Sequence, residues 1–142
     1  MQFHYNDGGR AAAGYKGVVG DCFVRALTIA GQYDYQEIYD LVNSMAVGER
    51  RGKRKRYVSS ARNGVYRICQ RKVMNHLDWT WVPTMFIGSG CNIHLRDTEL
   101  PSGRLVVCIS RHFVAVINGV INDLDNCSRD GSRCVYGYYV KE

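Results

Sequence analysis

The apolar residues of this chain change their spacing part way along the sequence, and this change restricts the folds it can adopt. Up to residue 76 they recur at the short intervals of amphipathic helices. From residue 104 they gather in β-branched runs that are typical of strands. Helices followed by strands indicate an α+β fold, in which we expect N-terminal helices packed on a C-terminal antiparallel β-sheet.

Three helices are predicted in the first half of the chain. The first covers residues 21–30, with Asp21 as its N-cap. The second begins at Asp34, because Glu37 follows at the spacing of a capping box. The third is expected over residues 60–76. The preceding segment, residues 1–20, is rich in glycine and is predicted to be irregular.

The strands of the second half are connected by a strong hairpin signal. Asn118 and Gly119 form a pair that favours a two-residue turn, which would set His112 opposite Asp125 and place Asp123 on the diagonal of the same face. The aromatic stretch 79–83 is expected to begin a further strand. The predicted strands of the hairpin region and the C-terminus are residues 104–109, 113–117, 120–123 and 135–140.

The length suits a single domain, and the first residues indicate that its six cysteines are reduced. We expect one domain over residues 1–142. No apolar run approaches the roughly 20 residues that span a bilayer, so no membrane contact is expected. The first residues lack the apolar segment of a secretory signal, and we therefore expect a cytoplasmic protein without disulfides. If one did form, Cys127 and Cys134, which flank a polar turn, would be the expected pair.

Metal binding and nucleic-acid binding are both weakly indicated. Cys91 and His94 offer two zinc ligands, but no second closely spaced pair completes a set of four, so we expect no metal and no other cofactor. The net charge of +6 is partly local. A cluster of basic residues within positions 50–56 indicates either a nucleic-acid contact or a solvated loop. We favour the loop, because no aromatic residues interleave with the charges. The cluster consists of Arg50, Arg51, Lys53, Arg54, Lys55 and Arg56.

Cys22 and His112 are the candidate reactive residues. Cys22 opens the first predicted helix, where the helix dipole favours the thiolate, although a packing role would also suit a small cysteine there. His112 lies at the junction of two strands, beside a carboxylate able to orient its ring. Asp123 and Asp125 are the alternatives for that carboxylate. We favour Asp123, because Asp125 begins a polar stretch where an aspartate often caps its own backbone.

The chain resembles papain-like cysteine peptidases, most closely small proteins of phages and bacteria. The similarity lies in GDCFVRA at 20–26, LPSGR at 100–104, SRH at 110–112 and AVINGVIND at 115–123. This resemblance implies a protein or peptide substrate, with Cys22 as nucleophile, His112 as base and Asp123 as the orienting acid.

One departure from that pattern concerns the oxyanion hole. Papain-like enzymes usually carry a glutamine six residues before the cysteine, and here that position is Lys16. Lys16 is either a donor in its place or a solvated surface lysine, and Tyr15 and Asn6 are weaker candidates for the donor. The leading hypothesis is a cysteine hydrolase that acts on a peptide, isopeptide or side-chain amide. The alternatives are an inactive papain-like scaffold that binds or inhibits another protein, and a nucleic-acid-associated protein.

Overall fold

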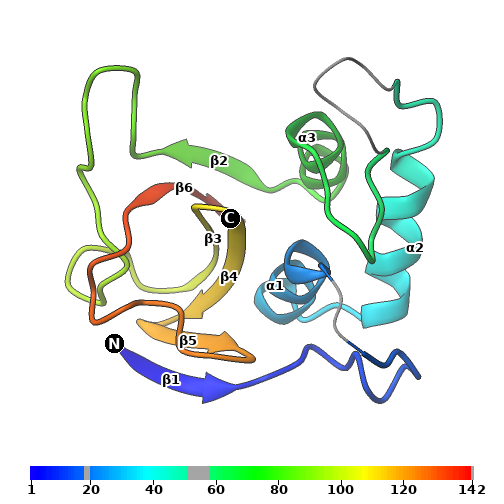
Figure 1. Ribbon diagram of the computed structural model, residues 1–142, viewed down its shortest axis with the longest axis horizontal. Helices are drawn as coiled ribbons and strands as arrows, with labels where there is room; N and C mark the ends of the chain where they lie inside the picture. Colours follow the sequence, from blue (N-terminus) through cyan, green and yellow to red (C-terminus); the bar gives the residue numbers. More distant parts are fainter. Residues whose placement is uncertain (18–19, 51–57, 142) are drawn as a thin grey trace.

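The computed structural model describes residues 1–17, 20–50 and 58–141, and it places three helices beside a six-stranded sheet (Figure 1). The chain is therefore α+β, as predicted. The helices are α1 (Cys22–Gly31), α2 (Tyr35–Met45) and α3 (Arg67–His76). The strands are β1 (Gln2–Tyr5), β2 (Thr80–Pro83), β3 (Arg104–Ile109), β4 (His112–Ile117), β5 (Val120–Asp123) and β6 (Val135–Val140). They lie in the order β1-β5-β4-β3-β6-β2.

Both faces of the central strands are covered, which explains why their sequences are apolar throughout. Successive residues of a strand point to opposite faces. On the helical face, Val106 of β3 belongs to a buried cluster with residues of all three helices. On the other face, Leu105 and Val107 are buried with Leu95 and Leu100 from the segment before β3.

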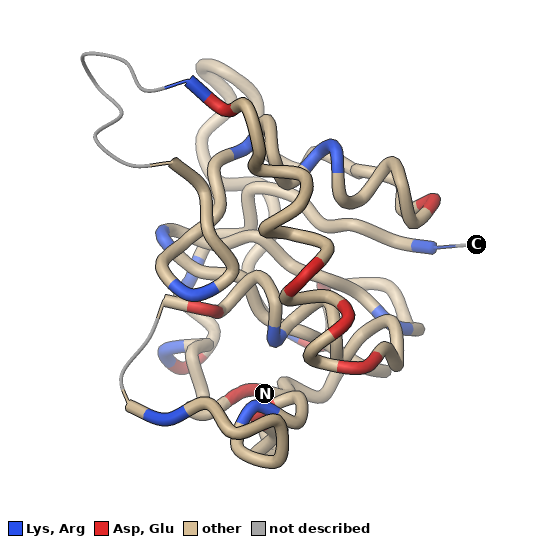
Figure 2. The backbone as a smooth tube through the Cα atoms, turned by 90° about the vertical axis from the view of Figure 1, so that its right-hand side faces the viewer, with Lys and Arg blue, Asp and Glu red and all other residues tan. Residues whose placement is uncertain are grey.

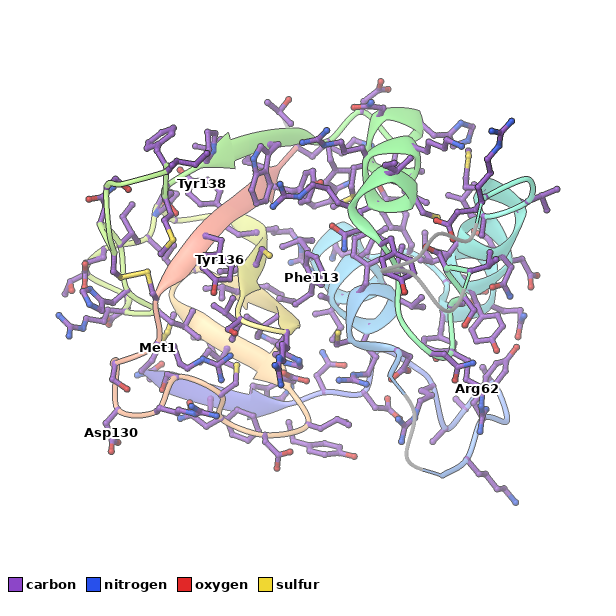
Figure 3. The ribbon with its side chains drawn as sticks, turned by 45° about the horizontal axis from the view of Figure 1, so that its top comes forward. Met1, Arg62, Phe113, Asp130, Tyr136 and Tyr138 are labelled. Atoms are coloured by element: carbon purple, nitrogen blue, oxygen red, sulfur yellow. A yellow bond between two sulfur atoms is a disulfide. The ribbon has the colours of Figure 1, made fainter. Side chains whose placement is uncertain are left out.

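α1 is the helix that contacts β4. The rings of Phe23 and Phe113 meet edge to face, with their centroids 5.2 Å apart, and Figure 3 shows Phe113 between the sheet and this helix. Packing of this kind brings the first turn of α1 close to the start of β4. Each fully buried apolar side chain contributes roughly 1.5–3 kcal/mol, so this contact helps to fix where the two elements meet.

The prediction of a wholly antiparallel sheet is wrong at one edge. β1 pairs in parallel with β5, from Gln2 opposite Val120 to Tyr5 opposite Asp123, and the sheet is therefore mixed. All four side chains of β1 are exposed. An edge strand of this kind needs no apolar pattern, so the glycine content of residues 1–20 predicted an irregular segment and the strand was missed.

The turn between β4 and β5 is confirmed. Ile117 pairs with Val120, and both Asn118 (φ 48°) and Gly119 (φ 79°) adopt the left-handed conformations that a type I′ turn requires. The ladder ends at the pair of Ala115 and Asn122. It does not reach the predicted opposition of His112 and Asp125.

Two details of the predicted helix starts differ from the structure. Asp34 does cap α2, since its Oδ2 accepts a hydrogen bond from the Glu37 N–H at 3.1 Å. Asp21 occupies the N-cap position of α1, but its side chain makes no capping bond. α3 begins seven residues later than expected, because residues 60–64 form a turn closed by hydrogen bonds between Ser60 and Gly64.

The prediction of no disulfide is wrong. Cys91 and Cys134 form one, with their Cα atoms 5.8 Å apart, and it appears as the yellow bond in Figure 3. Backbone pairing brings the two cysteines together: Leu95 N–H donates to the Arg133 carbonyl and Val135 N–H to the Ile93 carbonyl, both at 2.8 Å. The alternative pair of Cys127 and Cys134 does not form.

The structure describes only part of the basic cluster at residues 50–56. Arg50 is exposed, but the rest of the basic cluster, residues 51–56, lies outside the described residues. Figure 2, which views the molecule from the side of the helices, shows basic and acidic residues interspersed along that face. Among residues 1–17, 20–50 and 58–141, no helix has the length and apolar character needed to cross a membrane.

Candidate active site

The three residues favoured by the sequence come together where three elements meet. Cys22 is the first residue of α1, His112 is the first residue of β4 and Asp123 is the last residue of β5. His112 Nε2 lies 2.6 Å from Asp123 Oδ2. The imidazole of His112 lines the same cavity as the Cys22 thiol, and its hydrogen-bonding capacity and charge lower the pKa of that thiol. The three residues are therefore grouped in the order sulfur, imidazole, carboxylate.

Two local features hold Cys22 and His112 in place. The turn Ser110–Arg111 reverses the chain so that Ile109 pairs with His112, which puts the histidine at the very start of β4. Gly20 passes close to the neighbouring loop: a Cβ at this position would lie 2.9 Å from the Asn63 carbonyl oxygen. A glycine two residues before Cys22 thus lets the chain enter α1 against that loop.

The surroundings of Cys22 favour its thiolate. Burial alone raises the pKa of Cys22, but the hydrogen bond and the positive charge of His112 lower it. The backbone N–H of Phe113 donates to the sulfur, and the charge of Arg25 acts in the same direction. The net result is a pKa below the usual value of a cysteine, which increases the nucleophilic form at neutral pH.

His112 is held as the imidazolium. Burial lowers the pKa of His112, but hydrogen bonds to Asp123, Cys127 and Cys22 outweigh it and raise the pKa to about 11. Burial likewise raises the pKa of Asp123, while its bond to His112 and the charge of that ring lower it. The shifts together describe a thiolate, an imidazolium and a carboxylate in sequence.

A buried ion network, made of Asp21, Arg25 and Asp123, supports this group from behind. Arg25 lies one turn along α1 from Cys22, and its Nη2 is 3.3 Å from Asp123 Oδ1. Its Nη1 donates to Asp21 Oδ1, and the Tyr35 hydroxyl donates to Asp21 Oδ2 at 2.6 Å. The side chains of Asp21, Arg25 and Asp123 are all buried. Asp123 is thus fixed by a cation on each side.

Sequence reasoning missed two members of this arrangement. Asp21 was expected to cap α1, whereas its carboxylate binds Arg25. The available signal was Arg25 itself, a charged residue four positions after an aspartate within an otherwise apolar helix. Cys127 was also missed, and its thiol forms a hydrogen bond with His112. Asp125, the alternative orienting acid, is exposed at the edge of a nearby cavity.

A cavity of about 340 Å³, here called the Cys22 cavity, opens on the thiol. None of the three predicted oxyanion donors is among its lining residues in the described parts of the chain. The Tyr15 hydroxyl donates to Gln36 at 2.8 Å, and Lys16 is exposed. Arg67 and Gln70 of α3 do line the cavity, and both carry side-chain N–H donors.

His112 and Asp123 also belong to a set of residues that fits a metal ion. Single ligand atoms of His112, Asp123 and Cys127 lie within 4.8 Å of one another. These residue types are those that bind zinc. The geometry alone therefore permits two uses of His112 and Asp123, one in nucleophilic catalysis and one in metal binding.

Comparison with known proteins leaves the site to be interpreted from its own chemistry. The chain matches no family model, no curated protein and no solved structure.

Proposed function

We propose that this protein is a cysteine hydrolase of the papain-like type, which cleaves a peptide, isopeptide or side-chain amide bond through an acyl-enzyme. The observation that carries the proposal is the grouping of Cys22, His112 and Asp123, in which His112 is hydrogen-bonded to Asp123, the pKa of the thiol is lowered and that of the imidazole is raised. Pairing of this kind is how a cysteine becomes a strong nucleophile at neutral pH.

The proposed reaction uses each residue in turn. The Cys22 thiolate attacks the carbonyl carbon, forming a C–S bond and an oxyanion. His112 then gives its proton to the leaving nitrogen as the C–N bond breaks. Water attacks the resulting thioester, His112 takes a proton from that water, and the Cys22 thiolate is released with the acid product. Asp123 holds the ring and stabilises its charge throughout.

Stabilisation of the oxyanion would come from the start of α1 and from α3. The backbone N–H of Cys22 belongs to the first turn of a helix, where N–H groups lack intrahelical partners. We assign the second donor to Arg67 or Gln70 in place of Lys16. Gln70 is already oriented, because its Nε2 donates to the Val65 carbonyl at 2.7 Å and retains a second N–H.

A second candidate function is a binding protein built on an inactive scaffold of the same type. The observation that favours it is the position of Lys16, which is exposed and does not line the Cys22 cavity.

A cytoplasmic location remains a prediction. The disulfide of Cys91 and Cys134 is more typical of oxidising compartments.

The proposal is tested with an activated acyl ester, which requires no knowledge of the natural substrate. p-Nitrophenyl acetate should give a burst of about one equivalent of nitrophenol, followed by slower turnover. Mass spectrometry should find the acetyl group on Cys22, and the Cys22→Ser variant should show no burst. A burst absent from the wild-type protein, or an acetyl group on another cysteine, would favour the binding protein.

A further inference from the structure

A second cavity, of about 590 Å³, adjoins the candidate active site on the side of Asp123. It shares Arg111 and His112 with the Cys22 cavity, so a molecule bound at the thiol can extend into it. Four arginines line it, and we call it the arginine cavity: Arg25, Arg111, Arg129 and Arg133. Among the lining residues that the structure describes, the carboxylates are Asp123 and Asp125.

The positive charge of this cavity is largely uncompensated. Arg25 is paired with Asp123, which leaves three guanidinium groups against the single carboxylate of Asp125. Within residues 1–17, 20–50 and 58–141, no ion pair joins Arg111, Arg129 or Arg133 to a carboxylate. Positive charges gathered in a concave site raise the local concentration of anions.

The backbone holds the side chain of one of these arginines and is strained at two others. The Arg133 guanidinium donates to the Ser110 carbonyl at 2.8 Å, which keeps it beside the turn that carries Arg111. Arg111 (φ 57°) and Arg129 (φ 49°) both adopt the left-handed conformation that favours glycine or asparagine. Backbone strain of this kind costs about 1 kcal/mol or more per residue and often occurs at binding sites.

The positive charge of the arginine cavity favours an anion over a metal ion as its ligand. His112, Asp123 and Cys127 could supply three zinc ligands, but they line the same cavity as the four arginines. A dication would be repelled by these guanidinium groups, whereas a carboxylate or phosphate would be attracted. Guanidinium groups bind both anions through paired N–H donors.

We propose that the arginine cavity binds an anionic side chain, a carboxylate or a phosphate, of a polypeptide substrate whose cleaved bond lies at Cys22. The anion contacts Arg129 and Arg133, and Arg111 contacts the segment between the two cavities. The inference rests on the proposed function for its claim that the bound polypeptide is a substrate. The acidic residue then lies close to the cleaved bond, on the side of His112 that faces away from Cys22.

The experiment measures peptide binding to the Cys22→Ser variant, in which the nucleophile is absent. Fluorescence anisotropy compares a labelled alanine–glutamate peptide with its alanine–glutamine and alanine–phosphoserine counterparts. We expect the glutamate peptide, the phosphoserine peptide or both to bind at least about tenfold more tightly than the glutamine peptide. The stronger of the two identifies the anion.

Two variants test the location of the anion. Arg129→Gln with Arg133→Gln should remove most of the preference, and Arg129→Gln alone, at an exposed residue, should remove part of it. Arg62→Gln should leave it unchanged, because Arg62 is exposed at the opposite side of the molecule from the loop that carries Asp130 and Arg129 (Figure 3). Equal binding of charged and neutral peptides, or an equal loss with Arg62→Gln, would overturn the proposal.

Two further readouts separate this proposal from the proposed function. In the wild-type protein the preferred peptide should protect Cys22 from alkylation. Preferential binding without protection would leave an anion site but overturn the claim that its ligand is a substrate. A single-stranded oligonucleotide that binds more tightly than either charged peptide would overturn the choice of a polypeptide. Failure of the acyl burst alone contradicts only the hydrolase.

Discussion

Asp123 is the residue whose charge most affects the reactive pair. It accepts a 2.6 Å hydrogen bond from His112 and is itself held by Arg25. An opposite charge at this distance shifts a pKa by about 1–3 units. The carboxylate therefore keeps His112 protonated, and the protonated ring in turn keeps Cys22 ionised.

Replacement of Asp123 by asparagine should separate the two candidate acids. Asp123→Asn removes the charge, so the pKa of His112 should fall and that of Cys22 should rise. Alkylation of Cys22 near pH 6 should slow by about tenfold or more. Asp125→Asn should leave the rate near that of the wild type. A loss with Asp125→Asn but not with Asp123→Asn would reassign the orienting acid.

Arg25 should stabilise the fold by neutralising two buried carboxylates. Arg25→Met leaves Asp21 with only the 3.6 Å pair to Arg10 and Asp123 with only His112, and removal of one partner from a buried ion pair costs about 3–5 kcal/mol. The free energy of unfolding is measured in urea. Adding Asp21→Asn to Arg25→Met should recover part of the loss, since a buried carboxylate that has lost its nearest cation disappears. Equal stability of the wild type and Arg25→Met would contradict the network.

At the scale of elements, the hairpin of β4 and β5 delivers the base and the acid together. Its turn was predictable because Asn118 and Gly119 are a local signal that needs no knowledge of the rest of the fold. The partner of Asp123 across the hairpin was less predictable. The ladder ends before His112, so a diagonal contact replaces the simple opposition with Asp125.

The same turn provides a test of the hairpin's stability. Gly119→Ala introduces a side chain at φ 79°, where its Cβ would also lie 3.1 Å from that of Asp97. We expect a loss of about 1–2 kcal/mol in unfolding free energy. Gly48→Ala is the matched control, because Gly48 also has a positive φ but nothing lies within 4 Å of the added Cβ. Equal losses at the two positions would show that crowding against Asp97 contributes nothing.

At the scale of the whole molecule, residues far apart in sequence meet in ways that no local pattern encodes. The α+β class and most strands were predictable from the spacing of apolar residues. β1 was not predictable, since its side chains are exposed and the strand pairs with β5 through backbone hydrogen bonds. The contact of Arg25 with Asp123 spans 98 residues, and Cys127 meets His112 across a loop. Such contacts depend on how α1 packs on the sheet.

The disulfide is the clearest long-range correction, and its contribution can be measured directly. It closes a loop of 43 residues, for which the chain-entropy model gives about 4 kcal/mol. Cys91→Ser with Cys134→Ser should lower the unfolding free energy by about 2–4 kcal/mol. A reductant should do the same to the wild type and leave the double variant unchanged. Six alkylatable thiols in the unreduced, unfolded wild-type protein would contradict the bond.

The pH range of the reactive pair follows from the directions of its pKa shifts. The lowered pKa of Cys22 keeps the thiolate present at pH values where an ordinary cysteine is protonated. The raised pKa of His112, about 11, keeps the imidazolium present well above its usual range. The ion pair should therefore persist through neutral pH and be lost on the acid side as Cys22 takes up a proton.

The rate of Cys22 alkylation by iodoacetamide as a function of pH tests the central claim most directly. We expect the rate to reach its plateau at a lower pH than that of an ordinary cysteine, whose pKa is about 8.5, with labelling found on Cys22 and not on Cys108. Cys108 lines the same cavity and is an internal control, since burial raises its pKa to about 11. A Cys22 rate that climbs about tenfold per pH unit up to about pH 8, as for an ordinary thiol, would contradict the account.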